Sequence, residues 1–168
     1  MKNTVIKFGL YSLLVASILF AAALVFGDGM SYSTQEIFGY TTMALSLVFV
    51  FFGIRHYRNN VNDGKVSFGK ALLLGLFISA FAGLGFGIVD YIYTTVINPD
   101  FVADYEATMI ETMKAELSAA EFEVKSAELK QQMADYGSSG FMAALMFVTV
   151  VMMGFVVSLI SALILQRK

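Results

Sequence analysis

Four long apolar runs dominate this sequence and restrict the chain to a small set of folds. The runs cover residues 8–26, 37–54, 68–97 and 141–165. A helix needs about 20 apolar residues to cross about 30 Å of hydrocarbon, and each run is close to that length or longer. The composition agrees, since 58% of all residues are hydrophobic. The sequence therefore predicts an all-α fold, an integral membrane four-helix bundle that forms one domain over residues 1–168. The expected transmembrane helices cover about residues 6–26, 37–57, 67–97 and 141–165.

The basic residues gather on one side of these runs. Of the 11 lysines and arginines, most fall in three segments that four crossings bring to the same face: Lys2, Lys7, Arg55, Arg58, Lys65, Lys70, Arg167 and Lys168. By the positive-inside rule this face is cytoplasmic. The first run is also longer than the about 7–15 apolar residues of a signal-peptide core, so we expect it to stay as a helix. The prediction is a multi-pass protein of the cell inner (plasma) membrane with cytoplasmic N- and C-termini.

The segment between the third and fourth runs is acidic and amphipathic. Apolar residues recur in it at helical spacing, and carboxylates occupy the opposite face. Asn98 and Pro99 suit the start of a helix, and Ser118 with Glu121 forms a capping-box pattern at which a second helix can begin. We expect a helical extension over residues 99–136 on the outer face, as one helix or two. Because it is acidic, protein contact is favoured over binding to anionic lipid.

Small residues recur every four positions in two of the apolar runs. Such spacing places them in one stripe of a helix, where they allow a neighbouring helix to approach closely. The residues expected to pack in this way are Ala71, Gly75, Ser79, Gly83 and Gly87 in the third run, and Gly154, Ser158 and Ala162 in the fourth.

Several short motifs resemble a known family. They are Tyr57-Arg58, the run from Gly64 to Ala71, Gly75, and Ile97-Asn98-Pro99-Asp100. Together they resemble the pattern of a bacterial membrane family known as domain of unknown function 4199. The resemblance covers most of the chain. It implies an inner-membrane protein with four helices, and it implies no activity and no site residues.

Two groups of polar residues are candidate sites. Asp90 is the one acid inside an apolar run, and Glu36 is expected at a similar height. An intramembrane carboxylate suggests a proton or cation relay, but hydration at the outer border or a hydrogen bond to a tyrosine is the favoured explanation. The second group is basic and can bind an anionic headgroup or an acidic partner, or can simply anchor the helices. Its members are Arg55, Arg58, Lys65 and Lys70.

Several classes of site are disfavoured by composition. The chain has no cysteine and one histidine, which excludes disulfides and thiolate metal sites and makes a histidine cluster implausible. Its ten methionines are more typical of flexible packing than of copper binding. We expect no catalytic residues, no metal and no cofactor, and therefore no enzyme. Nucleic acid is not an expected partner either, because the chain has no separate basic domain.

The function predicted from these features is a structural or interaction role. The chain would be a helix-packing module that self-associates or docks to a larger inner-membrane complex. Its partners would be membrane lipids and either a homo-oligomer or another membrane protein. The alternative is a small transporter or channel subunit that uses Asp90 and Glu36, although solute pathways need polar linings that this sequence scarcely offers. A less favoured reading is an anionic-lipid-binding membrane protein.

Overall fold

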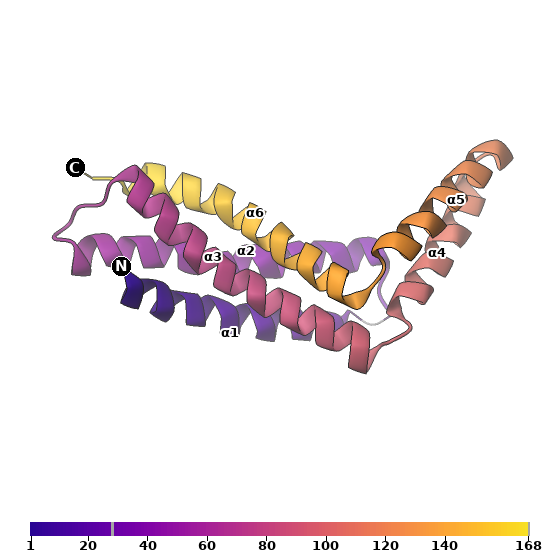
Figure 1. Ribbon diagram of the computed structural model, residues 1–168, viewed down its shortest axis with the longest axis horizontal. Coiled ribbons are helices and arrows are strands. Elements are labelled where there is room, and N and C mark those ends of the chain that lie inside the picture. Colours follow the sequence, from indigo (N-terminus) through magenta and orange to yellow (C-terminus); the bar gives the residue numbers. More distant parts are fainter. Residues whose placement is uncertain (28, 168) are drawn as a thin grey trace. The chain divides into compact units, whose positions relative to one another are not determined.

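The computed structural model describes residues 1–27 and 29–167, and this part of the chain is helical (Figure 1). Its helices are α1 (Lys2–Phe26), α2 (Tyr32–His56), α3 (Phe68–Ile92), α4 (Phe101–Glu116), α5 (Ala119–Tyr136) and α6 (Ser139–Leu165). Two π-helical turns of five residues, η1 (Tyr57–Val61) and η2 (Tyr93–Ile97), continue α2 and α3. The described residues form no strand, so the all-α prediction is confirmed for them. Lys168, one of the basic residues assigned to the cytoplasmic face, lies outside the described residues, as does Asp28.

Within the described residues, four helical segments are long and apolar enough to cross a membrane. They are Lys2–Phe26, Ser33–Val61, Phe68–Ile97 and Ser139–Leu165. This agrees with the four apolar runs, but α2 begins about a turn before its run. The Ser31 hydroxyl accepts a hydrogen bond from the Thr34 amide at 3.4 Å and so caps the helix. The start of α2 is therefore set by this cap and not by the first apolar residue.

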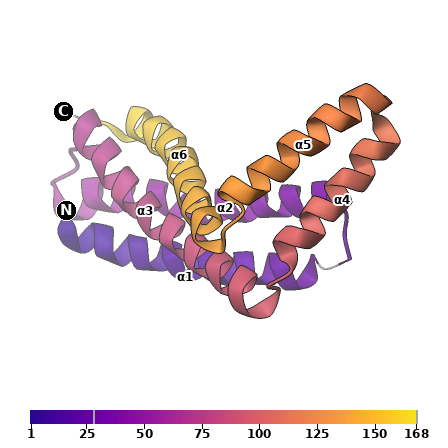
Figure 2. The same cartoon turned by 45° about the vertical axis from the view of Figure 1, so that its right-hand side comes forward.

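The chain divides into two compact units. Unit 1 contains residues 1–89 and the part of α6 from residue 145 onward, and unit 2 contains residues 90–144. In unit 1, α1 runs antiparallel to α2, and α3 runs antiparallel to α6 (Figures 1 and 2). The two chain ends and the α2–α3 connection lie at the same end of this unit (Figure 1). The basic segments thus share one end of unit 1.

The interior of unit 1 is filled by apolar side chains. The largest that are fully buried are Leu47, Val50, Ile54, Val66, Leu74, Ile78, Phe86 and Val150. The rings of Phe20 and Phe86 pack with their centroids 4.8 Å apart. Large apolar side chains also cover the outside, including Leu14, Ile18, Met152 and Ile160. An exterior with so many exposed large apolar side chains is unfavourable in water and suits a helix surface that faces lipid.

One buried hydrogen bond joins α1 to α2. The Ser12 hydroxyl donates to the backbone carbonyl of Ser46 at 2.8 Å. Hydrogen bonds between membrane helices contribute about 0.6 kcal/mol on average. We expect Ser12→Ala to lower the free energy of unfolding by about this amount, measured by thermal or denaturant unfolding in detergent. Thr41→Ala is the matched control, because the exposed Thr41 hydroxyl bonds only within its own helix. An equal loss in both variants would contradict this assignment.

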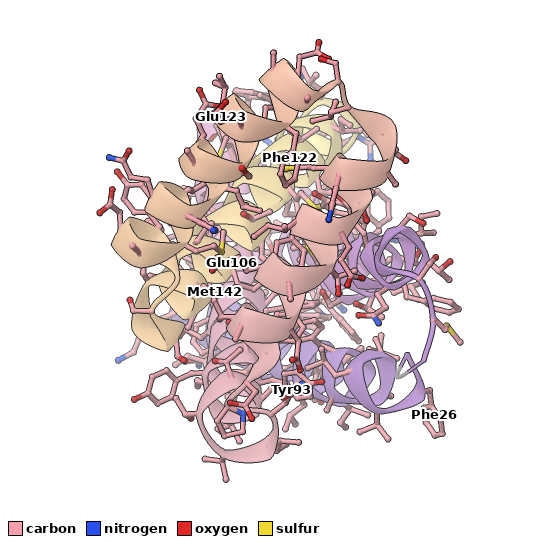
Figure 3. All side chains as sticks on the ribbon, turned by 90° about the vertical axis from the view of Figure 1, so that its right-hand side faces the viewer. Phe26, Tyr93, Glu106, Phe122, Glu123 and Met142 are labelled. Atoms are coloured by element: carbon pink, nitrogen blue, oxygen red, sulfur yellow. The ribbon has the colours of Figure 1, made fainter. Side chains whose placement is uncertain are left out.

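Unit 2 contains a helical hairpin, so the segment between the long helices forms two helices. The second begins with the expected capping box: the Ser118 hydroxyl accepts from the Glu121 amide at 3.4 Å, and the Glu121 carboxylate accepts from the Ser118 amide at 3.2 Å. The Ser118 hydroxyl also bonds to this carboxylate at 2.6 Å. These bonds stabilise the ionised carboxylate and lower the pKa of Glu121. In the same helix, Phe122 lies toward α4 and Glu123 on the outer side (Figure 3).

The expected role of Asn98 as a helix cap is wrong. Helix α4 begins at Phe101, its N-cap residue is Asp100, and that residue makes no capping bond with its side chain. The side-chain Nδ2 atom of Asn98 donates a hydrogen bond to the Tyr93 hydroxyl at 3.5 Å. The backbone carbonyl of Asn98 accepts a hydrogen bond from the Phe101 backbone amide. Asn98 therefore closes a turn between η2 and α4, and Tyr93 packs edge-on against Phe101 at 5.7 Å within the same unit.

Candidate functional sites

Helices α3 and α6 meet along a seam in which two glycines, Gly75 and Gly154, each lie opposite a serine of the other helix. A Cβ atom on Gly75 would lie 2.7 Å from Cβ of Ser158, and one on Gly154 would overlap the side chain of Ser79. Each serine hydroxyl is satisfied within its own helix, since Ser79 donates to Gly75 and Ser158 to Gly154. Both helices thus carry the same Gly-x-x-x-Ser motif in opposite directions, and the two motifs interlock.

The remaining predicted packing residues are buried as well. Gly83 lies against Phe147 of α6, where an added Cβ would be 2.8 Å from the ring and 3.0 Å from the backbone oxygen. Ala71, Gly87 and Ala162 are buried too. The stripe of small residues on α3 is therefore covered by the chain's own helices within unit 1.

A second seam, between α1 and α3, was not anticipated from the sequence. A Cβ on Gly85 would lie 2.8 Å from the backbone oxygen of Leu13, and a Cβ on Gly9 would lie 2.7 Å from the ring of Phe81. Gly9 and Leu13 are four residues apart in α1, and Phe81 and Gly85 are four residues apart in α3. Each helix thus presents one glycine to the other, one turn from the other contact. The signal in the sequence was a glycine in each of two apolar runs, which does not reveal that those two runs are neighbours.

Asp90 is almost fully buried, and only 7% of its surface is exposed. Its Oδ2 atom has no hydrogen-bond partner among the described residues. The Thr94 hydroxyl donates at 2.9 Å to the backbone carbonyl of Asp90 and not to its side chain. Glu36, the other predicted acid, is exposed in the first turns of α2. Within residues 1–27 and 29–167, no three histidines or acids gather in a way that could hold a metal ion.

The four basic candidates have different surroundings. Arg58 donates from Nη1 to the Leu165 carbonyl at 3.3 Å and from Nε to the Asn59 side chain at 2.8 Å. Leu165 ends α6, so Arg58 satisfies one of the carbonyls that a helix C-terminus leaves free. Close by, Val66 and Arg167 exchange two backbone hydrogen bonds. Arg55, Lys65 and Lys70 are exposed and make no side-chain hydrogen bond or ion pair within the described part.

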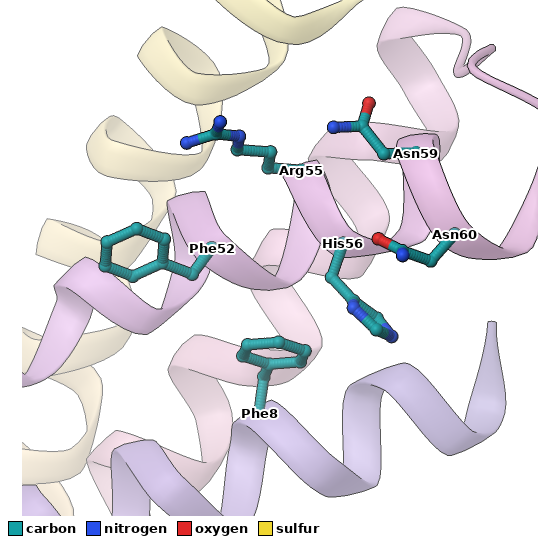
Figure 4. Close-up of a pocket in the computed structure, with 6 residues that line it drawn as sticks. All are labelled: Phe8, Phe52, Arg55, His56, Asn59 and Asn60. Atoms are coloured by element: carbon teal, nitrogen blue, oxygen red, sulfur yellow. The ribbon is translucent and has the colours of Figure 1, made fainter.

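A pocket of about 410 Å³ opens near the same end of unit 1 (Figure 4). It is lined by Phe8 of α1 and by a set of residues around the end of α2: Phe52, Arg55, His56, Asn59 and Asn60. The members of this set are spaced three, four, seven and eight residues from Phe52, which places them on one helical face. Of these residues, Arg55 is predictable from the charge pattern of the sequence, whereas the two phenylalanines and the two asparagines carry no comparable signal.

A comparison with known families gives one match. A family model described as "Protein of unknown function (DUF4199)" matches residues 7–167. This range contains nearly all of the four long helices and the hairpin between them. No curated protein and no solved structure matches the chain.

Proposed function

The chain belongs to the DUF4199 family, and we propose that it is a structural or interaction protein of the inner (plasma) membrane. In this proposal the four long helices form a membrane bundle that holds the acidic α4–α5 hairpin on the outer face, with both termini in the cytoplasm. The observation that carries it is the interlocked seam of α3 and α6. Helices packed through small residues along their length leave little room for a solute pathway, whereas a scaffold benefits from such rigidity.

The sidedness rests on charge. Seven described basic residues belong to segments at one end of unit 1: Lys2, Lys7, Arg55, Arg58, Lys65, Lys70 and Arg167. The positive-inside rule assigns such an end to the cytoplasm. Reporter fusions at residue 104 and after residue 167 test it, because they should report opposite sides of the membrane. Reporters on the same side would contradict the arrangement.

The docking surface is best sought on the hairpin. The small residues that were expected to mediate contact are covered within unit 1, so a partner must use another surface. The hairpin exposes carboxylates on both of its helices, at Glu111, Glu116, Glu123 and Glu128. We propose that this acidic surface contacts another membrane protein or a second copy of the chain, since charge of one sign steers association with a complementary surface.

Affinity purification from native membranes in a mild detergent tests the docking role. We expect a stoichiometric partner to co-purify with the wild-type chain. Replacing Glu111, Glu116, Glu123 and Glu128 with glutamine should lower its recovery about tenfold or more, because complementary charges at an interface are lost. The control replaces Lys114, Lys125 and Lys130 of the same helices with glutamine and should retain the partner. A wild-type chain that purifies alone as a monomer would contradict docking.

A second candidate function is a small transporter or channel subunit. The buried, unpartnered Oδ2 atom of Asp90 favours it, because intramembrane carboxylates often serve proton or cation pathways. The apolar filling of unit 1 speaks against it. Substitution of Asp90 distinguishes the two functions.

A further inference from the structure

The pocket on the C-terminal part of α2 combines cationic, amide and aromatic groups on one helical face. Arg55 and Asn59 form one edge of this face, while His56 and Asn60 lie toward Phe8 of α1 (Figure 4). We propose that this pocket binds the phosphate headgroup of one anionic phospholipid. The proposal goes beyond the docking role of the hairpin and stands independently of it.

The polar side of the pocket is built from unused hydrogen-bond donors. The exposed Arg55 guanidinium makes no hydrogen bond or ion pair with any residue that the structure describes. The Asn59 side-chain oxygen is already occupied by Nε of Arg58, at 2.8 Å, so its amide nitrogen remains free to donate. Arginine and amide N–H groups are donors that match the oxygens of a phosphate diester.

Arg58 prepares this edge without binding the ligand itself. Its guanidinium is held between Asn59 and the Leu165 carbonyl, where it caps α6. The contact fixes the Asn59 amide in the orientation in which its donor is free. The two arginines look equivalent in the sequence but have different roles. Arg58 positions the Asn59 side chain, and Arg55 contacts the anion.

The apolar side of the pocket suits the lipid region next to the headgroup. Phe52 is exposed, and the ring of Phe8 packs against His56 with a centroid distance of 5.2 Å. Both phenylalanines lie in segments that are apolar and long enough to span a membrane, whereas Asn59 and Asn60 lie at the end of the span Ser33–Val61. The pocket therefore changes from apolar to polar along α2, as a bilayer does from acyl chain to headgroup.

Charge favours an anionic occupant over a zwitterionic one. None of the described residues that line the pocket is acidic, and the Lys7 Nζ atom lies 5.7 Å from the centroid of the ring of Phe8, which lines it. A headgroup with net negative charge gains from both cations, whereas the choline of a zwitterionic lipid is repelled by them. The two aromatic rings that line the site favour a lipid over free inorganic phosphate, because inorganic phosphate has no apolar group that could pack against Phe8 and Phe52.

Native mass spectrometry of the full chain in mild detergent tests the proposal. The probes are phosphatidylglycerol, phosphatidylcholine and inorganic phosphate, each titrated separately. We expect one phosphatidylglycerol to bind with at least about tenfold higher affinity than phosphatidylcholine, because the choline group of phosphatidylcholine is repelled by Arg55 and Lys7. Arg55→Gln should remove most of this preference, and Arg55→Lys should restore part of it. Inorganic phosphate should not compete at millimolar concentration.

Lys70→Gln is the matched control, because Lys70 is an exposed cation in the first turn of α3 that does not line the pocket. It should leave the preference unchanged. An equal loss in Lys70→Gln and Arg55→Gln would mean diffuse attraction to the basic end of the unit and would overturn the site. Equal binding of the two lipids, or displacement of the lipid by inorganic phosphate, would overturn it as well.

Discussion

Replacing Gly75 with leucine should destabilise the bundle more than any other single change considered for this chain. The added side chain would occupy the space of the Ser158 side chain and meet Cγ1 of Val50, which lies 3.0 Å from the position of the new Cβ. Both neighbours are buried, so relief requires that α3 and α6 move apart. Overpacking of a filled core costs about 3 kcal/mol or more in such a case. Thermal unfolding in detergent, followed by circular dichroism, measures the loss.

Gly69→Leu is the control for this prediction. Gly69 also belongs to α3, but an added Cβ there meets no atom within 4 Å. The two variants share the same chemical change and differ in what the side chain meets, so Gly69→Leu should leave the melting temperature nearly unchanged. Gly83→Leu should also destabilise, because of Phe147. If Gly75→Leu melts like Gly69→Leu, the helices do not pack through this seam.

The contrast between the two seams shows what a sequence of this kind can reveal. Gly75 and Ser79 share a stripe with small residues every four positions, and the matching stripe at Gly154 and Ser158 made their packing predictable. Gly9 and Gly85 have no such repeat around them. Their contact follows from the tertiary arrangement that makes α1 and α3 neighbours, and apolar helices of similar length do not encode that arrangement in a readable way.

Helix capping could be predicted from the sequence where the side chain bonds to the backbone of its own helix. The Ser118 and Glu121 pair forms the capping box that its spacing indicates. Asn98 carries an equally suitable side chain, but Tyr93 offers its amide a partner and the helix starts three residues later. Propensity identifies residues that are able to cap, while neighbours brought close by the turn decide whether they do.

The pocket was predictable in part. Five of its residues lie on α2 and η1 at helical spacing, so their common face follows from the sequence. Phe8 comes from another helix and could not be assigned to the pocket from the sequence. The different roles of Arg55 and Arg58 depend on the end of α6, whose Leu165 carbonyl accepts a hydrogen bond from Arg58. The sequence shows the charge of both arginines and therefore places them in one basic group. It does not show that the Leu165 carbonyl accepts a hydrogen bond from Arg58.

Replacing Asp90 with asparagine should be tolerated and should raise stability. The carboxylate is buried, and its Oδ2 atom has no hydrogen-bond partner in the described part of the chain. Burying a charged group without a partner costs more than burying a neutral amide of the same shape. We therefore expect Asp90→Asn to increase the free energy of unfolding by about 1 kcal/mol at pH 8. In proteoliposomes, the wild-type chain and the variant should show equally low proton and cation flux.

Asp100→Asn provides the matched control, because Asp100 is an exposed acid of the same unit that makes no side-chain capping bond. It should change neither stability nor flux. The decisive result is the combination of the two readouts in Asp90→Asn. A stabilised variant without change in flux means that the buried carboxylate lowers the free energy of unfolding of a packed scaffold and has no role in transport. A wild-type flux that disappears only in Asp90→Asn means that the cost is maintained for transport, and the structural role proposed above would then have to be abandoned.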